Sequence, residues 1–275
     1  MNEELEKKKL CFFQRLMEEE KATKTIEKYK FILDNFMEYL KDKELEKNTI
    51  INFKQKLKDE NFSVATINNY VTVINKFLKY LKKEGLCIKL IKRQKKYSIE
   101  YSLSKTDYNR LLRGALKRNE ENYIILRILA ETGIRVSEIS NFSIEKLNTT
   151  MIIDNKGKTR EIIVTRKLLK NLRDYCRKNK IRTGLIIFNH KTKKAYSSST
   201  IWRRLKKLAG ECRVNKKCVY PHAFRHYFGV RYLETYPEDY LGLADILGHS
   251  SLETTRIYSA LTAKEKELKL RNVKF

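Results

Sequence analysis

Glycine and proline are scarce in this chain, and their scarcity limits the folds open to it. The 275 residues include 9 glycines and 2 prolines, so few positions suit the tight turns of a many-stranded β-fold. The sequence therefore predicts a mainly α-helical protein. A small β-hairpin is the expected exception, because two apolar segments at 151–154 and 161–164 flank a polar turn.

Hydrophobic periodicity organises the N-terminal part of the chain. Segments with one apolar face lie at about 3–18, 23–41, 47–58 and 63–81. Ser63 is a good N-cap for the last of these helices, and Gly85 is placed to end it. We therefore predict that residues 1–86 form a compact bundle of about four helices.

Residues 87–102 break this periodicity and are strongly basic. The basic side chains of the segment are Lys89, Lys92, Arg93, Lys95 and Lys96. An extended basic linker can follow the backbone of DNA, because contacts to phosphate give affinity that does not depend on base sequence. An ordinary solvated linker is the alternative interpretation.

The periodic pattern resumes near Ser104, and we predict a second, mixed α/β domain over residues 103–275. Ser104 and Asp107 have the form of a capping box, and Gly133 is placed to close an apolar helix at 123–132. Four further elements are expected: a buried apolar segment at 185–188, a helix from Ser199, a helix after Pro221 and a charged helix at about 262–271.

The charge of the chain indicates its class of partner. Sixty Lys and Arg against 33 Asp and Glu give a formal net charge of +27, which is typical of nucleic-acid-binding proteins. A lysine-rich surface that only confers solubility is the alternative. Because 41% of the residues are hydrophobic, the chain can build a sizeable core, which argues against wholesale disorder.

Cysteines and the N-terminal residues favour a cytoplasmic protein. The five cysteines form no CxxC pair, so reduced thiols are a simpler account than disulfides or a zinc site. The first residues, MNEELEKKKLCFF, lack the apolar run of a signal peptide. No apolar stretch approaches transmembrane length, so we expect no membrane partner.

Four short motifs, far apart in the chain, share a chemistry that suits a phosphodiester. They are TGIRVSE with Arg135, PHAFRH with His222 and Arg225, LGHS with His249, and TTRIYS with Tyr258. Guanidinium and imidazole groups can bind a phosphate in its transition state, and a tyrosine hydroxyl can attack phosphorus to form a covalent ester. His222 and Arg225 are three positions apart, so they share one helix face.

Over residues 104–260 these motifs, in this order, resemble those of tyrosine recombinases of the phage integrase family. Members of that family are site-specific DNA recombinases that cut through a 3′-phosphotyrosine link. The resemblance implies that Tyr258 is the nucleophile. It also implies a set of phosphate-binding residues: Arg135, His222, Arg225 and His249. Glu138, three residues after Arg135, is placed to orient its guanidinium.

The resemblance leaves the hairpin turn and one histidine open. The family's catalytic lysine comes just before the turn glycine, which favours Lys156, whereas a different gap in the turn would select Lys158. We interpret Lys158 and Arg160 as DNA contacts, together with the basic linker. His226 shares the helix face of His222, but a trailing histidine is usually structural in the family, and His190 lies in a polar turn.

Tyr258 is one of 16 tyrosines in the chain. Tyr227 and Tyr232 are its rivals, because they lie near the PHAFRH motif. They lack both the TTRIYS context and the spacing of nine residues after His249, so Tyr258 is the preferred nucleophile.

Neither a metal nor another cofactor is expected, because the sequence contains no HExxH motif and no P-loop. The resemblance implies double-stranded DNA recombination sites as partners. It also implies a tetramer on two sites, with residues 262–275 docking onto neighbouring protomers, although a monomer without DNA stays open. An accessory directionality factor is a further candidate partner.

The chain length resembles that of a simple Xer-type enzyme or a compact mobile-element integrase. The resemblance thus predicts an N-terminal helical core-binding domain followed by a catalytic domain. Two alternatives share this fold or chemistry: a type IB topoisomerase and a catalytically silent DNA-binding protein.

Overall fold

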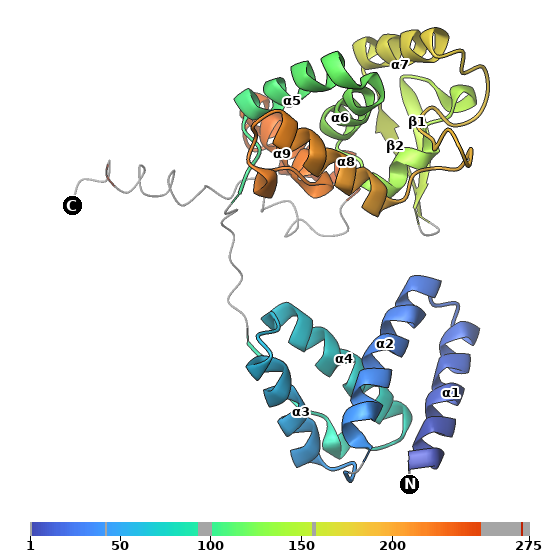
Figure 1. The fold of residues 1–275 in the computed structure, drawn as a ribbon, viewed down its shortest axis with the longest axis vertical. Coiled ribbons are helices and arrows are strands. Elements are labelled where there is room, and N and C mark those ends of the chain that lie inside the picture. Colours follow the sequence, from blue (N-terminus) through green and yellow to red (C-terminus); the bar gives the residue numbers. More distant parts are fainter. Residues whose placement is uncertain (1, 42, 93–100, 156–157, 249–270, 272–275) are drawn as a thin grey trace. The chain divides into compact units, whose positions relative to one another are not determined.

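The computed structural model describes residues 2–41, 43–92, 101–155, 158–248 and 271. The chain divides into two compact units, residues 1–95 (unit 1) and 96–275 (unit 2). Each unit has its own hydrophobic core. The described residues are mainly helical with one antiparallel hairpin, which confirms the predicted fold class (Figure 1).

Unit 1 consists of the amphipathic helices that the periodicity predicts. Its elements are α1 (Asn2–Glu18), α2 (Thr23–Leu40), α3 (Lys47–Asp59), α4 (Val64–Tyr80) and the short 3-10 turn η1 (Glu84–Leu86). Ser63 is confirmed as the N-cap of α4, since its hydroxyl oxygen accepts a hydrogen bond from the backbone N–H of Thr66 at 3.2 Å. The predicted helix end at Gly85 was wrong, because α4 ends at Tyr80 and Gly85 lies in η1.

Aromatic side chains fill the core of unit 1. Phe36 and Phe77 are fully buried, and the ring of Phe36 packs 5.2 Å from the ring of Phe53. The ring of Phe53 also packs 6.0 Å from that of Tyr70, so ring contacts join α2, α3 and α4. Removal of apolar surface is therefore the main force that holds this unit together.

The first residues after η1 pack on α4. The side-chain amide of Asn75 exchanges hydrogen bonds with the backbone of Ile88, at 2.8 and 3.1 Å. Asn68 does the same with Ile91, at 3.0 and 2.8 Å. Two asparagines on one helix thus replace the partners that a neighbouring strand would provide. The chain as far as Ile91 is therefore held as part of unit 1.

Unit 2 combines helices with the predicted hairpin. Its helices are α5 (Lys105–Arg118), α6 (Glu120–Thr132), α7 (Arg166–Lys178), α8 (Ser198–Glu211), α9 (Pro221–Thr235) and α10 (Tyr240–Leu247). Its 3-10 turns are η2 (Val136–Asn141), η3 (Ile144–Lys146) and η4 (Lys216–Cys218).

Serine side chains cap two of these helices. Ser104 is confirmed as the N-cap of α5, since it accepts a hydrogen bond from the N–H of Asp107 at 3.0 Å. The N-cap of α8 is Ser197, which accepts from the N–H of Thr200 at 3.1 Å, so the predicted start at Ser199 was wrong. Several adjacent hydroxyl residues at 197–200 offered competing caps, and local sequence could not choose among them.

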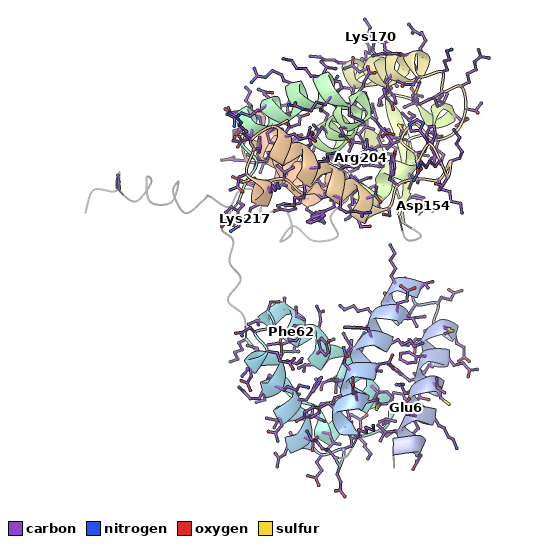
Figure 2. The ribbon with its side chains drawn as sticks, in the orientation of Figure 1. Glu6, Phe62, Asp154, Lys170, Arg204 and Lys217 are labelled. Atoms are coloured by element: carbon purple, nitrogen blue, oxygen red, sulfur yellow. The ribbon has the colours of Figure 1, made fainter. Side chains whose placement is uncertain are left out.

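The hairpin joins β1 (Thr150–Asn155) to β2 (Lys158–Ile163), with Ile153 opposite Arg160 and Met151 opposite Ile162. Met151, Ile153 and Ile162 are buried. Alternate residues therefore face the core. In Figure 2 the labelled Asp154 lies in β1 of this hairpin, and the labelled Arg204 lies in α8.

Helix α6 is the centre of unit 2. It packs against α5, α7 and α9 (Figure 1), and most of its residues are buried. A helix with most of its residues buried is surrounded by protein. Its C-terminal end is thereby fixed in position, and the candidate site begins there.

Candidate active site

Two helix C-termini meet at the site, and both end in a glycine with a left-handed backbone. Gly133 follows α6 with φ of +62°, and Gly248 follows α10 with φ of +65°. A Cβ atom on Gly133 would lie 2.7 Å from the Leu247 side chain and 2.8 Å from that of Phe228. Gly133 therefore allows both the turn and the close approach of α6 to α9 and α10.

Arg225 lies between these two helix ends. Its Nη1 donates a hydrogen bond to the carbonyl of Gly133 at 2.7 Å, and its Nη2 donates to the carbonyl of Leu247 at 2.6 Å. The residue is only 2% exposed. Carbonyls at helix C-termini carry partial negative charge, which compensates for burying a guanidinium. The structure thus fixes the position of a buried positive charge.

Arg135 is held by Glu138. The Glu138 carboxylate accepts a hydrogen bond from the backbone N–H of Arg135 at 2.8 Å and another from its Nη1 at 3.1 Å. Glu138 is 1% exposed, whereas the side chain of Arg135 is 37% exposed. A buried carboxylate therefore orients a guanidinium that still reaches the surface.

A second arginine binds the same carboxylate. Arg160 Nη2 donates to Glu138 Oε2 at 2.9 Å, the oxygen that also accepts from the backbone N–H of Arg135, and Arg160 Nη1 donates to the carbonyl of Ile246 at 2.5 Å. The Arg160 side chain is only 15% exposed, so its described contacts are with protein groups. Strand alternation explains why Arg160 points inward. It is two residues before the buried Ile162 and therefore lies on the same, inward face of β2.

His222 lies in the first turn of α9 and is exposed. Desolvation by the surrounding protein lowers the pKa of its imidazole, and the positive charges of Arg225 and Arg135 lower it further. The predicted trio of Arg135, His222 and Arg225 is therefore brought together from α6–η2 and α9. In its neutral form an imidazole can donate one hydrogen bond to an anion.

His226 and His190 lie in different surroundings. Burial lowers the pKa of His226 to about 4, which keeps its ring neutral. His190 packs against Phe188 and has its Nε2 4.0 Å from Glu121. His190 lines a cavity of about 660 Å³ beside α8.

The rival tyrosines are poorly suited to be nucleophiles. Tyr227 is buried against the ring of Tyr108, 4.7 Å away, and burial raises the pKa of its hydroxyl. The hydroxyl of Tyr232 donates to Asp239 at 2.6 Å, which raises its pKa to about 12. A raised pKa makes loss of the phenolic proton more difficult.

Comparison with known proteins identifies the family. Residues 102–265 match the phage integrase family, and residues 11–85 match the phage integrase N-terminal SAM-like domain. The chain belongs to the phage integrase family. The two matched regions fall in the two compact units, since unit 1 ends at Lys95 and unit 2 begins at Lys96.

Curated relatives are tyrosine recombinases. The chain is 32% identical over 170 residues to tyrosine recombinase XerA of Pyrococcus furiosus, covering 59% of this chain and 58% of that protein. It is 30% identical over 160 residues to tyrosine recombinase XerD of Listeria monocytogenes serotype 4b, covering 54% and 52%. The chain thus spans little more than half the length of the curated relatives it matches.

Solved structures share the fold. The XerH site-specific recombinase bound to palindromic difH substrate, in a post-cleavage complex, matches with a TM-score of 0.73 and 19% identity, over 90% of this chain and 79% of that one. A lambda integrase dimer bound to a COC′ core site matches with a TM-score of 0.74 and 13% identity, over 92% and 76%. This phage integrase family member therefore has the same fold as these two structures.

Several predicted site residues lie outside the described residues: Lys156, His249, Tyr258, Arg93, Lys95 and Lys96. Lys158 begins β2. Lys89 and Lys92 follow η1, and the carbonyl of Lys89 accepts a hydrogen bond from Lys54 Nζ at 2.7 Å.

In the part of the chain that the structure describes, no cluster of three or more His, Cys, Asp or Glu side chains could hold a metal ion. The same residues include no helix that combines the length and apolar character needed to cross a membrane.

Proposed function

We propose that this chain is a site-specific DNA recombinase that cuts and rejoins DNA through a 3′-phosphotyrosine intermediate. The observation that carries the proposal is the convergence of Arg135, His222 and Arg225 at the ends of α6 and α10, in a member of the phage integrase family. The tyrosine recombinases among its relatives support the same activity.

The two arginines would bind the non-bridging oxygens of the phosphate undergoing attack. Guanidinium groups keep their charge at any working pH and match a phosphate with paired donors. Arg225 is anchored by two backbone carbonyls and Arg135 by Glu138, so little reorganisation is needed as charge develops. His222, whose pKa is lowered by desolvation and by the charges of Arg225 and Arg135, would donate a further hydrogen bond.

The covalent step would use residues known here from sequence alone. The hydroxyl of Tyr258 would attack phosphorus and release its proton to water, while the bond from phosphorus to the 5′-oxygen breaks. Lys156 supplies the proton to that oxygen, and His249 donates to the phosphate. A 5′-hydroxyl from a partner duplex then attacks the phosphotyrosine and restores Tyr258. The phosphodiester energy is kept in the tyrosine ester, so no nucleotide cofactor is required.

DNA would be the main partner. The net charge of +27 favours binding to phosphate, with the basic segment Lys89–Lys96 and Lys158 as candidate contacts. Related recombinases have been crystallised on their DNA sites. We further propose a cytoplasmic enzyme of the Xer or mobile-element type that acts as a tetramer, with residues 262–275 as the contact between protomers.

A plasmid assay tests the proposal. Two copies of the DNA flanking the gene are placed on one supercoiled plasmid, and the products are separated after incubation with protein. The proposal predicts excised or inverted products that need both sites. Relaxation that needs no specific site would indicate a type IB topoisomerase instead, and binding without any product would favour the silent DNA-binding protein.

A further inference from the structure

Arg160 ties the hairpin to the C-terminal end of α10. Its guanidinium spans two acceptors, Glu138 Oε2 at 2.9 Å and the Ile246 carbonyl at 2.5 Å. These acceptors come from η2 and α10, more than 100 residues apart in the sequence. A planar guanidinium suits such a span, because its donors point in fixed and different directions.

The end of α10 receives two arginines in succession. Arg160 binds the carbonyl of Ile246, and Arg225 binds the carbonyl of Leu247. Carbonyls in the last turn of a helix lack intrahelical partners and attract cations. The chain then turns at Gly248 and continues to His249, which the proposed mechanism assigns to the phosphate.

Side-chain packing supports the same link. A Cβ atom on Gly248 would lie 2.6 Å from Cδ of Arg160, so the stem of Arg160 lies directly against the turn. The side chain is 15% exposed, and the carboxylate it shares with Arg135 is 1% exposed. A buried carboxylate between two guanidiniums fixes both of them.

We propose that Arg160 is a positioning residue for the cleavage reaction rather than a contact to DNA phosphate. It sets the orientation of Arg135 through Glu138, and it holds the end of α10 that leads into His249. This inference rests on the proposed recombinase function, since it assigns Arg160 a role in that reaction.

Two substitutions separate positioning from phosphate binding. In Arg160→Lys the charge remains, but an ammonium cannot span Glu138 and the Ile246 carbonyl as a guanidinium does. In Arg160→Gln the charge is lost. We expect both variants to cleave a nicked DNA substrate roughly 10- to 100-fold more slowly in single-turnover assays. The dissociation constant for DNA and its salt dependence should stay close to those of the wild type.

Arg173→Gln is the matched control, because it removes one exposed arginine of unit 2. A phosphate contact would give a different pattern: Arg160→Gln would weaken binding and lower the salt slope by about one, and Arg160→Lys would restore both. That pattern, or a wild-type cleavage rate in Arg160→Lys, would overturn the proposal.

Amide hydrogen exchange supplies a readout that needs no DNA. Loss of Arg160 should speed exchange in α10, where the Gly248 N–H is bonded to the Asp245 carbonyl at 2.9 Å. Unchanged exchange would contradict the link to α10. If the wild type forms no DNA adduct at all while exchange changes as expected, the recombinase proposal fails and the structural link stands. If the wild type forms an adduct and both Arg160 variants match it in rate, the positioning proposal alone fails.

Discussion

The two units of the molecule bury charge to different degrees. Among the described residues, unit 1 buries one charged side chain, Lys9, whereas unit 2 buries Glu121, Arg127, Glu138 and Arg225. A charge removed from water is costly unless it is closely paired. Unit 1 therefore resembles a domain shaped by apolar packing, while unit 2 keeps fixed charges in its interior.

Buried charge alone does not mark the site within unit 2. Arg127 pairs with Glu131 on its own helix, at 2.5 and 2.9 Å, and Glu121 pairs with Arg204. Arg225 differs because its described partners are backbone carbonyls at two helix ends. The comparison teaches that the buried arginines of unit 2 are held in two ways: Arg127 by a carboxylate on its own helix, and Arg225 by backbone carbonyls at two helix ends.

The largest expected effect is on the stability of unit 1. Phe36→Ala removes a fully buried ring and should lower the free energy of unfolding by about 3–5 kcal/mol. Phe31→Ala on the same helix is the control, because that ring is 63% exposed. Denaturant titration of both variants checks this. Equal losses from the two substitutions would contradict the packing account of unit 1.

Arg225→Lys tests the fixed charge of unit 2. It should slow cleavage roughly 100- to 1000-fold, because an ammonium cannot keep both carbonyl contacts and also clamp a phosphate. Arg231→Lys, farther along α9, changes an arginine paired with Glu234 and should cleave at close to the wild-type rate. Single-turnover cleavage and DNA binding are measured side by side. A near-normal rate for Arg225→Lys would remove that residue from the site.

Gly248→Ala tests whether the turn after α10 affects cleavage as well as stability. The left-handed backbone alone should cost about 1–2 kcal/mol of stability. Gly184→Ala is the matched control, since Gly184 also has a positive φ (+76°) but no atom within 4 Å of an added Cβ. Both variants should lose stability in thermal unfolding. Only Gly248→Ala should also slow cleavage, by about tenfold. If Gly248→Ala and Gly184→Ala cleave at the same rate, the packing of Arg160 on this turn does not matter for cleavage.

The smallest effect concerns pH. Burial lowers the pKa of His226 from 6.5 to about 4, so the unfolded state takes up a proton first as the pH falls. Stability from this group is full above pH 6.5 and is lost as the pH falls toward 4. We expect a loss of about 1 kcal/mol, allowing for partial exposure of the ring.

His226→Gln should flatten that decline in a series of denaturant titrations. His190→Gln controls for the loss of one histidine from unit 2. An equally steep decline in His226→Gln would mean that other groups control the acid response.

Most helices and two of their caps could be predicted, because they depend on nearby residues. Period-three-and-four patterns located α2 and α4, and Ser63 and Ser104 cap helices as expected. The C-terminal end of α4 was harder to predict. The helix stops four residues before the η1 turn that contains Gly85.

Contacts between distant segments could not be predicted from local pattern. Arg225 bonds to the Gly133 carbonyl, 92 residues away, and Arg160 to the Ile246 carbonyl, 86 residues away. Backbone carbonyls carry no sequence signature, so neither partner can be deduced from the motifs. Strand alternation could have indicated that Arg160 faces inward, although the sequence analysis interpreted this residue as a DNA contact.

The most direct test is to trap the covalent intermediate. Wild-type and Tyr258→Phe protein are each incubated with nicked substrates made from the DNA flanking the gene and then separated under denaturing conditions. The account predicts a protein–DNA adduct with the wild type and none with Tyr258→Phe, while both proteins bind the DNA equally well. An adduct that persists in Tyr258→Phe would contradict the account, because another residue would then be the nucleophile.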